Sequence, residues 1–95
     1  SFPKKGERCL EIGASPGSWT WALQKMGADI IAVDRAPLSK EVASLPGISF
    51  LKKDAFSLVP DSLPKIDWLF SDVVCYPKKL FEWLQPWLRT DLSIV

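Results

Sequence analysis

The sequence predicts one α/β domain over residues 1–95, with a parallel sheet of about five strands, flanking helices and a sheet left incomplete at its C-terminal end. Short runs of apolar, β-branched residues alternate along the chain with segments whose apolar residues recur at helical period. Turns rich in glycine, proline and serine separate these runs. Closely spaced strands and helices of this kind form right-handed βαβ units, in which the strands run parallel.

The first strand and the first helix lie on either side of a turn of small residues. Residues 8–12 form a short strand, and residues 13–17, Gly-Ala-Ser-Pro-Gly, form a tight turn after it. The next helix has one apolar face, because its apolar side chains fall at i, i+3, i+4 and i+7: Trp19, Ala22, Leu23 and Met26. Gly27 is placed to end this helix.

Two further strands follow, separated by a short helix. Residues 30–33, Ile-Ile-Ala-Val, are a continuous apolar run, which is typical of a parallel strand buried on both faces. The short helix begins near Ser39, turns Val42 and Leu45 inward, and stops before a Pro-Gly pair. Residues 48–51 then form the third strand.

The last part of the chain predicts another strand–helix pair. Residues 55–65 are a loop with at most one helical turn, and residues 66–70 are the fourth strand. Pro77 suits the first turn of a helix whose inner face holds Leu80, Phe81 and Leu84. Pro86 is expected to kink or end that helix, because proline lacks the backbone donor.

A fifth strand begins within residues 92–95, where the sequence stops. Such a strand leaves an open sheet edge, so we expect a fragment of a larger protein, shortened at both ends and able to self-associate through this edge.

The composition excludes several classes of protein. The formal net charge is +1, so charge alone does not indicate a nucleic-acid-binding protein. The chain has no histidine and only two cysteines, Cys9 and Cys75, which argues against a metal site and excludes imidazole catalysis within these residues. We expect both thiols to be buried and reduced. Without a signal peptide or an apolar run near the ~20 residues that span a bilayer, a soluble cytoplasmic protein is expected.

The turn at residues 13–17 is the strongest indication of a ligand. A phosphate-binding P-loop needs a lysine after its last glycine, and none follows Gly17. The dinucleotide fingerprint needs a glycine where Ser15 stands, and a third glycine that is missing. Glu11 closes the strand before the turn, and this acidic-x-Gly-x-x-x-Gly pattern is the form used for S-adenosylmethionine.

Three aspartates follow successive strands and so belong to one edge of the sheet, where open α/β sheets bind their ligands. Asp34 can accept hydrogen bonds from ribose hydroxyls, as it also would with a nicotinamide cofactor. Asp54 is placed to meet an adenine amino group, and Asp72 lies where a substrate would approach the methyl group. The alternative for each is a strand-end or helix-capping role.

Four segments together resemble the FtsJ-like ribose 2′-O-methyltransferases that act on RNA, and most closely the branch that modifies large-subunit ribosomal RNA. They keep the order and spacing of that family and span nearly the whole chain: residues 11–21 (Glu-Ile-Gly-Ala-Ser-Pro-Gly-Ser-Trp-Thr-Trp), 33–37 (Val-Asp-Arg-Ala-Pro), 54–56 (Asp-Ala-Phe) and 68–74 (Trp-Leu-Phe-Ser-Asp-Val-Val). The Gly-Ala-Ser-Pro-Gly-x-Trp segment is the most specific of them.

The resemblance implies a Rossmann-like methyltransferase fold, S-adenosylmethionine as cofactor and an RNA substrate. Glu11 and the turn would bind the methionine end, Asp34 the ribose and Asp54 the adenine, while Asp72 matches the aspartate of the family's Lys-Asp-Lys-Glu catalytic group. The cofactor-binding turn residues implied are Gly13, Ala14, Ser15, Pro16 and Gly17, with Trp19 in the same motif.

The chain departs from the family in its catalytic group, of which it retains only Asp72. The two lysines and the glutamate of that group fall outside residues 1–95, so these residues alone are expected to be inactive, and a non-catalytic cofactor-binding module is the alternative. Lys52-Lys53 and Lys78-Lys79 either contact RNA phosphates or are solvated surface. Trp21 is expected to pack against a neighbouring element rather than to stack on a base.

Overall fold

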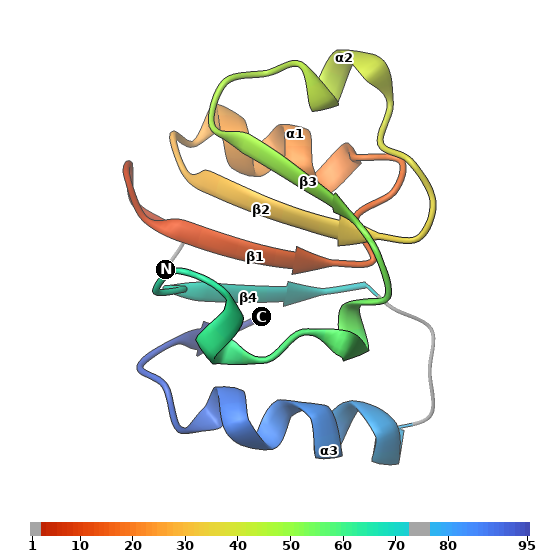
Figure 1. Ribbon diagram of the computed structural model, residues 1–95. Helices are drawn as coiled ribbons and strands as arrows, with labels where there is room; N and C mark the ends of the chain where they lie inside the picture. Colours follow the sequence, from red (N-terminus) through yellow and green to blue (C-terminus); the bar gives the residue numbers. More distant parts are fainter. Residues whose placement is uncertain (1–2, 73–76) are drawn as a thin grey trace.

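A computed structural model describes residues 3–72 and 77–95 and shows a parallel sheet between two layers of helices (Figure 1). The strand order is β3-β2-β1-β4-β5, and every described pair is parallel. The strands are β1 (Arg8–Ile12), β2 (Asp29–Asp34), β3 (Ile48–Lys52), β4 (Trp68–Ser71) and β5 (Ser93–Ile94). The expected Rossmann-like α/β fold is therefore confirmed.

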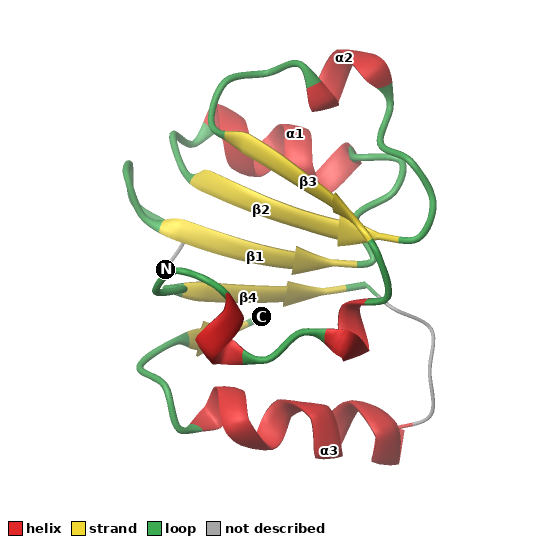
Figure 2. Cartoon of the chain, viewed as in Figure 1, coloured by secondary structure: helices red, strands yellow, loops and turns green. Residues whose placement is uncertain are grey.

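The helices divide between the two faces of this sheet (Figure 2). On one side, α1 (Ser18–Lys25) and α2 (Lys40–Ala43) accompany β2 and β3. On the other side lie α3 (Pro77–Leu88) and two 3₁₀ turns, η1 (Ala55–Ser57) and η2 (Pro60–Ser62). The loop expected over residues 55–65 thus holds two helical turns instead of one. No helix among the described residues is long and apolar enough to span a membrane.

Each face of the central strand β1 contributes to a separate apolar core. Cys9 points to the α1 side and packs in a cluster with Leu23 and Ala32. Leu10 and Ile12 point to the opposite side, where they share a cluster with the fully buried Trp87. Strands buried on both faces in this way explain the continuous apolar runs in the sequence.

The buried face of α1 differs from the expected one. Trp19 is 60% exposed and Met26 is 37% exposed, whereas Thr20 and Leu23 are buried. Thr20 can be buried because its hydroxyl donates a hydrogen bond to the Glu11 carboxylate. Trp21 is also 52% exposed, so the expectation that it packs against a neighbouring element was wrong.

The inner face of α3 was predicted correctly for Leu80 and Leu84, which pack against the core, and wrongly for Phe81. Phe81 is 63% exposed, and the side chains that pack inward include Trp83 and Trp87, whose ring centroids are 5.2 Å apart. Pro86 does not end the helix, which continues to Leu88. A proline near the C-terminal end removes only one backbone hydrogen bond, and packing of Trp87 offsets that loss.

Two other differences concern the ends of elements. The fourth strand begins at Trp68, and Ile66 is a buried loop residue before it. The fifth strand is limited to Ser93–Ile94, with Ile94 exposed at the sheet edge. Cys75 lies outside the described residues, and so does the segment in which a capping contact of Asp72 with α3 would be made, whereas Cys9 is a buried free thiol as expected.

Candidate functional site

The carboxyl ends of four strands meet at one edge of the sheet, because the strands are parallel. β1 runs into the glycine turn, β2 ends at Asp34, β3 leads to Asp54 and β4 leads to Asp72. The backbone N–H of Asp72 donates to the carbonyl of Ile12 at 3.0 Å, which fixes Asp72 beside the start of the turn. The fold therefore brings the acidic residues expected at this edge to one side of the molecule.

The glycine turn is held against β2 and α2. The N–H groups of Gly13 and Ala14 donate to the Val33 carbonyl at 2.9 and 3.2 Å. Gly17 has a φ of 122°, and a Cβ there would lie 3.1 Å from the nearest side-chain carbon of Val42. Glycine is required at this position, because another residue would meet both backbone strain and a clash.

The Asp34 carboxylate anchors the middle of the same turn. Its Oδ2 accepts the N–H of Ser15 at 2.8 Å, and its Oδ1 accepts the N–H of Ala36 at 2.9 Å. Pro16, joined to Ser15 by a cis peptide bond, accepts the N–H of Ser39 on its carbonyl at 2.9 Å. Each carboxylate oxygen has a second lone pair, so Asp34 can organise the turn and still bind a hydroxyl.

Asp54 has the capping contact foreseen as the alternative role, together with an ion pair. Its Oδ1 accepts the N–H of Phe56 at 3.0 Å, and its Oδ2 lies 2.8 Å from the guanidinium of Arg35. These hydrogen bonds, from Phe56 first and Arg35 second, lower the pKa of Asp54. The carboxylate is therefore ionised and able to accept a further hydrogen bond.

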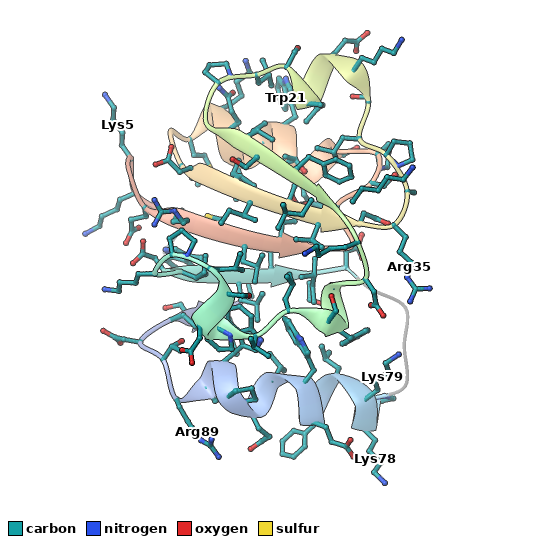
Figure 3. All side chains as sticks on the ribbon, viewed as in Figure 1. Lys5, Trp21, Arg35, Lys78, Lys79 and Arg89 are labelled. Atoms are coloured by element: carbon teal, nitrogen blue, oxygen red, sulfur yellow. The ribbon has the colours of Figure 1, made fainter. Side chains whose placement is uncertain are left out.

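A polar cleft of about 410 Å³ lies between the glycine turn and the ends of β2 and β3. Asp34, Asp54 and Asp72 all line it, and Figure 3 shows Arg35 and Lys79 on this side of the molecule. The Lys79 ammonium lies 4.7 Å from the ring centroid of Phe56, in a cation–π arrangement. The other lining residues are Gly13, Ser15, Val33, Lys53 and Ala55.

A second, more apolar cleft of about 650 Å³ lies on the α1 side of β4. Asp72 lines both clefts, so the two meet at this residue. The remaining walls of the second cleft are Pro3, Glu11, Trp19, Trp68, Phe70, Ser71, Ser93 and Val95. Pro16 and Gly17 line neither cleft and instead border a shallower hollow beside Trp21, while Ala14 is buried.

Glu11 is the buried charged group of the site, with only 3% of its surface exposed. Burial raises the pKa of Glu11 to about 7. The hydrogen bond from Thr20 lowers this pKa, and the charge of Asp72 raises it by a smaller amount. A carboxyl group that changes its charge near neutral pH is more common at functional sites than elsewhere.

Sequence reasoning missed two side chains at this edge: Thr20 is the hydrogen-bond partner of Glu11, and Arg35 pairs with Asp54. Lys79, for which contact with RNA phosphates and a solvated surface role were both left open, reaches the polar cleft from α3. Of the two missed residues, Thr20 carried a signal, since it lies three residues before Leu23 and so on the same helix face. Among the described residues, no three histidine, cysteine or acidic side chains are grouped to hold a metal ion.

Comparison with known proteins identifies relatives that contain a similar segment. Ribosomal RNA large subunit methyltransferase M of Halorhodospira halophila is 37% identical over 89 residues, covering 94% of this chain and 26% of the relative. The proteins of the same name from Hahella chejuensis and Thauera aminoaromatica are 34% and 32% identical, covering 93% and 95% of this chain but 22% and 24% of those relatives. The chain therefore spans about a quarter of the length of these relatives.

The family model of the FtsJ-like methyltransferases matches residues 1–89. This range contains the glycine turn, both clefts' acidic residues and the first four strands. The chain belongs to the FtsJ-like methyltransferase family.

Proposed function

We propose that this chain is the S-adenosylmethionine-binding part of an enzyme that methylates ribosomal RNA on a ribose 2′-hydroxyl. The observation that carries the proposal is the meeting of a polar and an apolar cleft at Asp72. The family is one of methyltransferases, and the relatives are named for large-subunit ribosomal RNA. The 2′-hydroxyl as methyl acceptor rests on the resemblance of the sequence segments.

The chemistry of the acidic residues fits this cofactor. Asp34 and Asp54 accept hydrogen bonds at the edge of the polar cleft, as ribose hydroxyls and an adenine amino group require. Glu11 and Trp19 line the second cleft, where the ammonium group of the methionine end would meet the buried Glu11 carboxylate. The close approach of Gly17 to Val42 keeps the glycine turn packed against α2. S-adenosylmethionine supplies the methyl group when it is bound.

Asp72 would act where the cofactor and the acceptor hydroxyl meet. Its side chain is exposed and lines both clefts, while its backbone is fixed to β1. A carboxylate at this point can accept a hydrogen bond from the acceptor hydroxyl or orient a neighbouring cation, and positioning of this kind supplies much of the rate in group transfer. The other members of the family's catalytic group would come from outside these residues.

RNA would approach the same edge of the sheet. Lys53 and Lys79 line the polar cleft, so one lysine of each basic pair is placed beside the proposed cofactor site. Such cations can meet the phosphates of a bound RNA and make its affinity depend on salt. A ribosomal RNA substrate also supports a cytoplasmic location for the whole protein.

Calorimetric titration with S-adenosylhomocysteine tests the proposal. Asp34→Ala should weaken binding by about tenfold or more, because a hydrogen bond to a charged group contributes about 1.5–3 kcal/mol. Asp29→Ala is the matched control, since Asp29 is exposed at the opposite end of the same strand, and it should bind like the unmodified chain. Equal losses in both variants, or no binding by the folded unmodified chain, would contradict the proposed site.

A further inference from the structure

The Glu11 carboxylate lies among apolar neighbours on the α1 side of the sheet. Its register partners are Ala32 on β2 and Phe70 on β4, neither of which can donate a hydrogen bond from its side chain. The one described side chain that donates to it is Thr20, whose hydroxyl lies 2.5 Å from Oε1. No described donor is bonded to Oε2, and Glu11 lines the apolar cleft.

Among the residues that the structure describes, no cation balances the charge of Glu11. The titratable groups whose charges act with Glu11 are Asp72, at the end of β4, and Cys9, two residues earlier on β1. Both oppose its ionisation when they carry negative charge, and α1 contributes only the neutral Thr20. A buried carboxylate without a counter-ion lowers the stability of the folded chain. A ligand cation bound beside Glu11 would offset this loss.

Thr20 has no evident reason to be polar apart from this contact. It is fully buried on the face of α1 that also carries Leu23, where an apolar side chain would normally stand. A threonine hydroxyl in a helix can bond to the carbonyl four residues earlier, yet here it donates across to β1. The contact therefore joins the first helix to the buried carboxylate.

We propose that Thr20 is a positioning residue, whose hydroxyl holds the Glu11 carboxylate ionised and aimed into the cleft to receive the ammonium group of the cofactor's methionine end. This inference rests on the proposed function for the identity of the cation. Thr20 would thus orient the buried carboxylate in addition to filling space in the core.

The first test needs no ligand. The side-chain ¹³C resonance of Glu11, assigned with Glu11→Gln, is followed by NMR from pH 4 to 10 in the unmodified chain, Thr20→Val and Thr20→Ser. Thr20→Val keeps the volume but loses the donor, so the titration midpoint should rise by about one unit. Thr20→Ser should restore the midpoint of the unmodified chain. Identical midpoints in the valine and unmodified chains would overturn the proposal.

The second test measures S-adenosylhomocysteine affinity against pH in the same three chains. Thr20→Val should bind about tenfold more weakly at pH 6, and the difference should vanish by about pH 9, because only the ionised fraction of Glu11 binds the ammonium group. A loss of affinity that is constant across pH would mean a packing role and refute the positioning role. If the unmodified chain binds no ligand, the proposed function fails, while the NMR titration still decides whether Thr20 controls Glu11.

Discussion

Gly17→Ala tests whether the glycine turn is as tightly constrained as the geometry indicates. The φ of 122° is one that residues with a Cβ rarely adopt, which costs about 1–3 kcal/mol. The new Cβ would also lie between 3.1 and 3.3 Å from three carbons of Val42, and such overpacking costs about 1–3 kcal/mol more. The variant should therefore lose roughly 2–6 kcal/mol, a large part of the stability of a small domain.

Urea denaturation followed by tryptophan fluorescence gives the free energy of unfolding of each variant. Gly6→Ala is the control, because Gly6 also has a positive φ, of 85°, but nothing lies within 4 Å of its added Cβ. It should lose only the backbone part, about 1–2 kcal/mol. In a double-mutant cycle, Val42→Ala removes two of the three contacting carbons but keeps its Cβ, so it should recover part of the overpacking cost of Gly17→Ala, about 1 kcal/mol or more. A Gly17→Ala loss no larger than that of Gly6→Ala, with no coupling to Val42, would show that contact with Val42 does not constrain the turn.

Three further predictions follow from burial. Burial, with a smaller effect from Glu7, raises the pKa of the Cys9 thiol to about 12, so in a Cys75→Ser background this thiol should resist alkylation at pH 8 until urea unfolds the chain; rapid labelling of the native protein would contradict this. Burial also raises the pKa of Glu11 from 4.5 to about 7, so the stability contributed by its neutral form is full below pH 4.5 and is lost as the pH rises through 7. The free energy of unfolding of the unmodified chain should therefore fall by about 3 kcal/mol over that range, and in Glu11→Gln this fall should be absent. The same pH profile in both proteins would contradict this prediction. Trp87→Ala should cost about 3–5 kcal/mol and Trp21→Ala much less, because Trp87 is 1% exposed and Trp21 is 52% exposed; equal losses in urea denaturation would show that the packing is different.

The fold could be predicted because its signals are local. Apolar runs such as residues 30–33 and the small-residue turn after residues 8–12 each indicate one element, and the alternation of elements fixes a parallel sheet. The orientation of the helices could not be predicted as well. Thr20 looks like a surface residue until its partner Glu11 is known to be buried across from it. Periodicity records side-chain polarity but not the contacts between elements.

The same limit applies to α3 and to the site. Phe81 and Trp87 are both apolar, so helical period alone could not decide which of them faces the core. The edge that carries Asp34 and Asp54 followed from topology, because the carboxyl ends of parallel strands coincide. The ion pair of Asp54 with Arg35 joins side chains 19 residues apart and had no signal in the sequence.

The proposed site places the cofactor at the carboxyl edge of the sheet, across the two clefts that meet at Asp72. Backbone amide shifts, mapped by ¹H–¹⁵N NMR during titration with S-adenosylhomocysteine, test this placement. We expect the largest shifts on amides at that edge, those of Ser15, Ala36, Phe56 and Asp72, while amides at the opposite edge, such as that of Asp67, stay unchanged. Shifts centred on the opposite edge, or no shifts at saturating ligand in a folded chain, would show that the cofactor does not bind there.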